Sequence, residues 1–138
     1  MKVFLDANVI IDVVLNRTDF VETSSKVLQL GLDGDCELCA SDITFTTVSY
    51  YARKNRTVSQ LYEVLQTLRS FIDVVPSGKI AIDWALGQKS KDFEDAVQYY
   101  SALRSGAEFI VSRNSRDYPF TDIPVISPLQ FLKDMGVC

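Results

Sequence analysis

Three aspartates of this chain could do chemistry together, because each stands near the end of a predicted strand or the start of a predicted helix. Asp6 directly follows the apolar run Val3 to Leu5. Asp95 lies in the first turn of a helical apolar pattern, and Asp117 lies in the loop after the run Phe109 to Val111. Carboxylates that crowd together repel one another unless a cation neutralises them, and oxygen ligands suit Mg²⁺ or Mn²⁺. A divalent metal site built on these three aspartates is therefore our first hypothesis.

Each of these acids also has an ordinary structural interpretation. Asp6 is placed to cap the helix that follows it, and Asp117 precedes a Tyr-Pro pair, where aspartate is a common turn residue. Asp92 is a good N-cap residue, with Asp95 at the third helical position as in a capping box. Taken alone, Asp92 fits a cap better than a site, while both interpretations stay open for the other three.

The composition narrows the chemistry. The chain has 138 residues and no histidine, which excludes Ser-His and Cys-His dyads and every zinc site that contains histidine. The formal net charge of −4 argues against general electrostatic attraction to nucleic acid, but it is compatible with a local basic patch. Taken singly, each basic residue near the acids is best interpreted as an ordinary solvated surface residue. The candidates for phosphate contacts are Lys89, Lys91, Arg113 and Arg116.

Two cysteines form a C-x-x-C spacing at Cys36 and Cys39. No second pair exists to complete a zinc site, and a thioredoxin-like motif should open a helix, whereas this pair falls in a predicted strand. We therefore interpret both as ordinary buried thiols.

Short apolar runs that alternate with helical patterns predict an α/β fold with a mostly parallel central sheet and helices on both of its faces. We expect strands at residues 3–5, 37–40, 72–75, 108–112 and 124–126. We expect helices at about residues 8–15, 21–32, 43–54, 58–71, 80–87, 93–105 and from 128 onward. If the first and fourth strands are neighbours, Asp6 and Asp117 share the carboxyl edge of the sheet, where ligands of such sheets collect.

The pattern contains no internal repeat or linker, so we expect a single domain over residues 1–138. No apolar stretch approaches the ~20 residues that span a bilayer. The N-terminus lacks the order of a signal peptide, because Asp6 interrupts it early. These features predict a cytoplasmic protein that does not enter the membrane.

Four motif blocks, in order, cover nearly the whole chain. They are VFLDANVIID from Val3 to Asp12, DFEDAVQY from Asp92 to Tyr99, IVSRNSRDY from Ile110 to Tyr118, and IPVISPLQFL from Ile123 to Leu132. As a set they resemble a PIN-domain protein, of the VapC-like kind found as ribonuclease toxins in prokaryotic toxin–antitoxin pairs. The resemblance implies a three-layer α/β/α fold and an endoribonuclease that uses Mg²⁺ or Mn²⁺.

By position, the resemblance makes Asp6 and Asp95 two of the family's acids. The family's last block offers an acid just after the strand, often with a second acid three residues on; these positions hold Asn114 and Asp117 here. The resemblance therefore implies that Asp6, Asp95 and Asp117 are the catalytic and metal-binding residues. The implied supporting residues are Asn8, Asp92, Ser112 and Asn114.

The chain departs from the family at Thr47, where many members have a glutamate in a helix. A hydroxyl is a poor substitute for a carboxylate in binding a divalent ion, although Glu94 or Asp92 could compensate. This departure keeps a second hypothesis open, in which the site is degraded and the PIN-like domain is an RNA- or protein-binding module. Metal titration separates the two, because a degraded site binds no Mn²⁺ specifically.

The resemblance to ribonuclease toxins implies an RNA substrate, a small antitoxin protein as a partner, and a homodimer. The exposed side of the predicted helices between Ile43 and Phe71 is a candidate surface for either protein contact. A third hypothesis, a phosphoryl-transfer or receiver-like domain with Asp6 as phosphoacceptor, is weaker. The dehalogenase pattern needs a second aspartate where Asn8 stands, and a receiver domain needs a late lysine where Arg113 stands.

Overall fold

The computed structural model describes residues 1–120 and 122–137, and for Asp117 the backbone alone. Five strands of this described chain form one parallel sheet in the order β3-β2-β1-β4-β5. Leu5 pairs with Val111, so the first and fourth strands are neighbours as expected. The strands are β1 (Lys2–Leu5), β2 (Glu37–Ser41), β3 (Ile72–Val75), β4 (Phe109–Val111) and β5 (Val125–Ile126).

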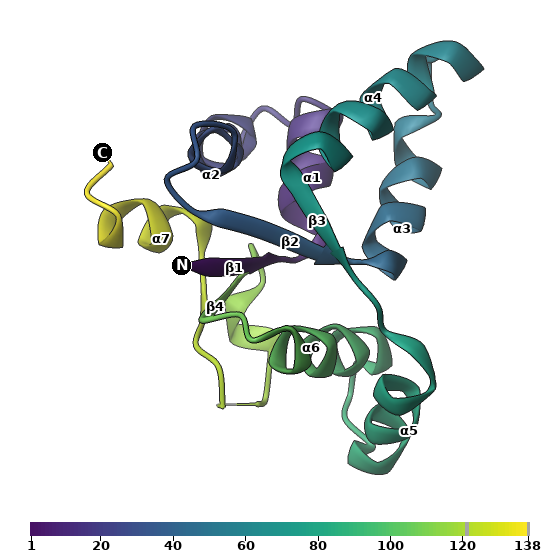
Figure 1. The fold of residues 1–138 in the computed structure, drawn as a ribbon, viewed down its shortest axis with the longest axis vertical. Coiled ribbons are helices and arrows are strands. Elements are labelled where there is room, and N and C mark those ends of the chain that lie inside the picture. Colours follow the sequence, from purple (N-terminus) through teal and green to yellow (C-terminus); the bar gives the residue numbers. More distant parts are fainter. Residues whose placement is uncertain (121, 138) are drawn as a thin grey trace.

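Helices cover both faces of the sheet, which confirms the predicted three-layer α/β class. Figure 1 shows α1 to α4 and α7 on one face, and α6 on the other with α5 packed against it. The helices are α1 (Ala7–Val14), α2 (Val21–Leu32), α3 (Asp42–Ala52), α4 (Val58–Phe71), α5 (Gly78–Gln88), α6 (Phe93–Ser105) and α7 (Pro128–Asp134). None of these described helices has the length and apolarity needed to cross a membrane.

The strand β1 is apolar throughout because it lies at the centre of the sheet and both its faces are buried. Val3 and Leu5 belong to the core beneath α1, α2 and α7, whereas Phe4 belongs to the core beneath α6, with Tyr99 and Ile110. The alternation of side chains along a strand produces this division. Burial of the central strand therefore fixes where its last residue, and Asp6 after it, must lie.

The two cysteines are buried free thiols, as the sequence indicated. Cys39 lies within β2, but Cys36 lies just before the strand and not inside it. Cys36 packs into the core under α1 and α2, while Cys39 packs into the core under α6, on the opposite face of the sheet. Burial raises the pKa of Cys39 to about 11, so this thiol is inert at neutral pH.

Candidate active site at the carboxyl edge of the sheet

Asp6 lies where β1 ends and α1 begins, and neighbouring groups orient its side chain. Its backbone N–H donates to the carbonyl of Val111 on β4 at 3.0 Å. Asp6 occupies the N-cap position of α1, yet its carboxylate accepts no cap hydrogen bond in the described structure. Its Oδ2 instead accepts hydrogen bonds from the hydroxyls of Ser112 at 2.8 Å and Tyr118 at 2.9 Å. Asp6 is nearly buried, with 9% of its surface exposed. Its carboxylate is held by two hydroxyl donors from the segment that follows β4, and it does not cap its helix.

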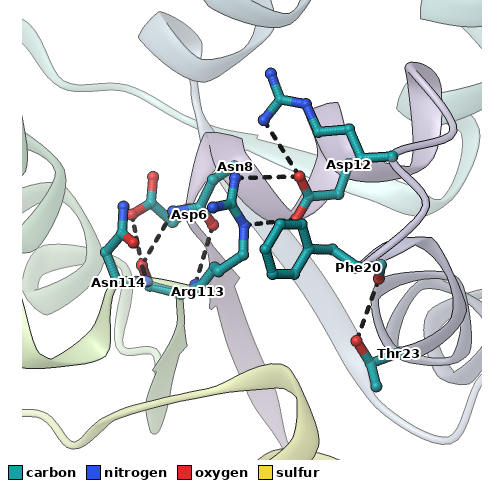
Figure 2. Close-up of polar contacts among 9 residues, drawn as sticks. Asp6, Asn8, Asp12, Phe20, Thr23, Arg113 and Asn114 are labelled. Atoms are coloured by element: carbon teal, nitrogen blue, oxygen red, sulfur yellow. Dashed lines mark hydrogen bonds and ion pairs between the residues drawn. The ribbon is translucent and has the colours of Figure 1, made fainter.

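A polar network joins the start of α1 to the segment that follows β4. Asn8 donates through Nδ2 to the Ser112 hydroxyl at 3.3 Å and accepts the backbone N–H of Arg113 at 3.1 Å. The backbone N–H of Asn114 donates to the same Ser112 hydroxyl at 3.1 Å. Figure 2 shows Asp6, Asn8 and Asn114 converging at this junction. The supporting residues Asn8, Ser112 and Asn114 are thus brought together around Asp6.

A buried ion pair anchors the same segment. Asp12 on α1 is fully buried and accepts two hydrogen bonds from Arg113, from Nε at 2.9 Å and from Nη2 at 3.1 Å. Arg17 adds a contact at 3.3 Å, and the Arg113 guanidinium stacks 4.1 Å above the ring of Phe20 (Figure 2). One edge of the Arg113 guanidinium, formed by Nε and Nη2, and one of its faces are therefore engaged within the protein.

Asp92, Glu94 and Asp95 gather at the N-terminus of α6. Asp92 is the N-cap, and its Oδ1 accepts the backbone N–H of Asp95 at 3.0 Å, which confirms its expected capping role. Asp95 is half-buried at the third helical position. Negative charge at a helix N-terminus is favourable, so α6 stabilises this cluster in part.

The acids of α6 and Asp6 act on one another electrostatically across the edge of the sheet. Burial raises the pKa of Tyr118 well above its ordinary value, and the nearby charges of Asp6, Asp95 and Asp92 raise it further. Burial also raises the pKa of Glu94, with added repulsion from Asp6 and Asp92. The phenol of Tyr118 therefore keeps its proton and donates it in a hydrogen bond to Asp6. The carboxylates around it form a region of negative potential, and a bound cation would reduce their mutual repulsion.

The comparison with protein families gives a match to the PIN domain over residues 2–116. The chain belongs to the PIN-domain family. This PIN domain is 31% identical over 138 aligned residues to the protein named Ribonuclease VapC1 of Aquifex aeolicus, covering 94% of this chain and 92% of that one.

Two solved structures share the fold of this PIN domain. A toxin–antitoxin complex from Klebsiella pneumoniae matches with a TM-score of 0.65 and 20% identity, covering 91% of this chain and 97% of that one. The structure of FitAB bound to IR36 DNA fragment matches with a TM-score of 0.62 and 17% identity, covering 91% and 94% of the two chains.

Thr47 and Asn114 are the uncharged residues at two positions where the family often has an acid, and they differ in how deeply they are buried. Thr47 is half-buried on α3. One turn earlier, Thr44 is fully buried and accepts a hydrogen bond from Nε2 of Gln98 on α6 at 2.9 Å. Asn114 is exposed at the start of the short 3-10 turn Ser115–Asp117. Helix α3 is thus linked to α6 through an uncharged hydrogen bond at Thr44.

The remaining residues predicted for the site are either exposed on the surface or have side chains that the structure does not describe. The side chain of Asp117 lies outside what the structure describes. Among the described side chains, no three acidic or thiol groups are close enough together to hold one ion. Lys89, Lys91 and Arg116 are exposed. Sequence reasoning overlooked Tyr118 as a site residue, because its only signal was its place in the loop after the fourth strand.

Proposed function

We propose that this PIN domain is a metal-dependent endoribonuclease and the toxin of a toxin–antitoxin pair. The observation that carries the proposal is the placement of Asp6. It is a nearly buried carboxylate at the end of the central strand, oriented by the Ser112 and Tyr118 hydroxyls and repelled by the acids that open α6. The likeness over almost the full length to a protein named Ribonuclease VapC1 supports the same conclusion.

In this proposal Asp6, Asp95 and Asp117 hold Mg²⁺ or Mn²⁺, with the Asn114 amide as a neutral neighbour. Carboxylate and amide oxygens are the hard donors that these ions prefer. When bound, the metal supplies an acidified water and stabilises negative charge on the scissile phosphate. Ser112 and Tyr118 both donate to Oδ2 of Asp6, so its other carboxylate oxygen is the one that would hold the ion.

The protein's own groups supply the rest of the reaction. An unligated carboxylate among the acids accepts the proton of the attacking water, which needs no imidazole and fits a chain without histidine. Lys89, Lys91 and Arg116 are exposed and contact RNA phosphates beside the acids. We assign Arg113 to anchoring the loop and not to phosphate, because its guanidinium is already held by Asp12.

The proposed partners are RNA, an antitoxin protein and a second copy of the chain. The two structures of similar fold are titled as a toxin–antitoxin complex and as FitAB bound to DNA, which supports an antitoxin partner. Such a partner places a basic side chain among the acids, where it offsets their repulsion. The exposed side of α3 and α4 is the surface that we propose for protein contacts. A cytoplasmic location follows from an RNA substrate and an antitoxin partner.

The test is Mn²⁺-dependent cleavage of single-stranded RNA by the wild type, by Asp6→Asn and by Asp83→Asn. Asp83 is an exposed acid on α5 and serves as a control for loss of one negative charge. We expect cleavage by the wild type and Asp83→Asn, its loss on adding a chelator, and little cleavage by Asp6→Asn. Equal cleavage by Asp6→Asn, or cleavage that a chelator leaves unchanged, contradicts the proposal.

A second candidate is a PIN domain that binds RNA or protein without cleaving it. The neutral residues Thr47 and Asn114, at positions that are often acidic, favour it. Isothermal titration with Mn²⁺ separates the two functions. An enzyme binds Mn²⁺ in a way that depends on Asp6, whereas a degraded site gives no specific heat.

A further inference from the structure

A pocket of about 400 Å³ adjoins the acids, between the end of α5, the start of α6 and the segment Pro119–Phe120. We propose that this pocket binds one unpaired base of the RNA, next to the phosphate that is cleaved. The inference rests on the proposed function and adds to it a subsite that selects single-stranded substrate. The volume is within the ~300–1,000 Å³ of pockets that hold small molecules.

The apolar wall of this base pocket is the ring of Phe120, which its neighbours hold in place. Phe120 is half-buried and packs at 5.1 Å from the ring of Trp84 and at 4.9 Å from the ring of Tyr99. Tyr99 in turn is fully buried, and its hydroxyl accepts the backbone N–H of Ile123 at 2.7 Å. A preorganised aromatic ring beside Pro119 is the usual platform on which a single-stranded base stacks.

The polar wall favours a neutral base over a phosphate. Asp92 and Asp95 both line the pocket, and among the lining residues that the structure describes Lys91 is the one cation. A phosphate would meet two carboxylates, whereas the amino and imino N–H groups of a base can donate to them. Gln88, whose amide both donates and accepts, lies at the exposed end of α5 and can pair with the edge of the same base.

The position of the pocket links recognition to cleavage. Asp95 belongs to its wall and is also one of the proposed metal ligands, so a base that stacks on Phe120 brings its neighbouring phosphodiester to the acids. A base paired within a duplex is not free to enter, which makes unpaired RNA the preferred substrate.

The test measures binding of a single-stranded RNA with 2-aminopurine at successive positions, since stacking quenches the fluorescence of this base. Binding is measured with Mn²⁺ chelated, so that the RNA stays intact. We expect the wild type to quench one position strongly. Phe120→Leu should lose that quenching and bind ~10-fold more weakly, which corresponds to the loss of ~1.4 kcal/mol of stacking. Phe120→Tyr, which keeps the ring, should retain both.

Two further variants separate binding from folding. Phe93→Leu removes an exposed ring from α6 that does not line the pocket, and it should bind as the wild type does. Gln88→Ala changes an exposed side chain, leaves the melting temperature unchanged and should weaken binding several-fold. Mn²⁺ affinity should be the same in every variant, because none of the changed residues is a proposed ligand.

The outcomes distinguish the subsite from the function on which it rests. If the wild type cleaves RNA but Phe120→Leu binds and quenches unchanged, the subsite is wrong and the enzyme stands. Equal weakening by Phe93→Leu, or loss of Mn²⁺ affinity in Phe120→Leu, also overturns the subsite. If the wild type neither binds nor cleaves RNA, the proposed function fails and the subsite fails with it.

Discussion

The buried pair between Asp12 and Arg113 gives the sharpest prediction about stability. Replacing Asp12 with asparagine keeps the volume of the side chain but removes its charge. One of the two oxygens that receive Arg113 becomes an amide nitrogen, so a donor then faces a donor. Asp12 is fully buried, and water cannot replace the lost contact at its end.

The size of the effect follows from the exposure of the two partners. Removing one partner of a fully buried pair costs about 3–5 kcal/mol. The Arg113 side chain is 25% exposed and can turn partly into water, so we expect a smaller loss of about 2–3 kcal/mol. For a chain of this length that loss lowers the melting temperature by about 10 °C.

A matched control comes from Asp83, which contacts Lys79 at 2.6 Å on α5. This pair is shorter than the Asp12 pair, but its side chains are 56% and 88% exposed. Exposed pairs contribute about 0–1 kcal/mol, so Asp83→Asn should change the free energy of unfolding by less than about 1 kcal/mol. Urea unfolding of both variants measures the difference. If the two changes cost the same, burial does not decide the strength of these pairs and the reasoning fails.

Three further predictions concern the acids. Mn²⁺ at ~100 times its dissociation constant should stabilise the wild type by about 2.7 kcal/mol, and differential scanning fluorimetry should show this shift lost in Asp6→Asn. Tyr118→Phe removes a hydroxyl that donates to the Asp6 carboxylate and should cost about 1.5–3 kcal/mol in urea unfolding, whereas the same change at exposed Tyr62 should cost almost nothing. The raised pKa of Glu94 means that its ionised form is disfavoured in the folded protein, so wild-type stability falls as pH rises through that pKa. Glu94→Gln should therefore be the more stable protein near neutral pH, with the advantage vanishing in melting curves near pH 4.

The sequence predicted the elements well because their signals are local. Apolar runs and helical spacing identified every strand and every α-helix that the structure describes, and the limits of α2, α4 and α6 agree to the residue. The short 3-10 turn Ser115–Asp117 falls in what was predicted as a loop. Caps explain part of this agreement: Thr57 forms a capping box with Gln60, and Gly106 ends α6 in the left-handed region with φ of 79°. Strand β5 is shorter than expected, because Pro124 lacks the N–H that a strand residue donates.

The contacts of the site were harder to predict, because they depend on which strands are neighbours. The pairing of β1 with β4 brings Ser112 and Tyr118 to Asp6 across more than a hundred residues of sequence. Nothing in the local pattern around Tyr118 indicates that its hydroxyl donates to a carboxylate. Asp6 itself fits a helix cap equally well until these partners are known.

The first motif block shows how one short sequence serves two purposes. Asp6 lies at the N-cap of α1, where the backbone is still extended, whereas Asp12 lies inside the helix, so the two side chains reach different groups. Asp6 therefore turns toward Tyr118 and the acids of α6, while Asp12 turns toward Arg113. Because Ser112 and Arg113 are adjacent, the two aspartates hold the same loop from two directions. Asp12→Asn should accordingly weaken the loop that carries the proposed ligand Asp117, and lower RNA cleavage as well as stability, without altering any ligand itself.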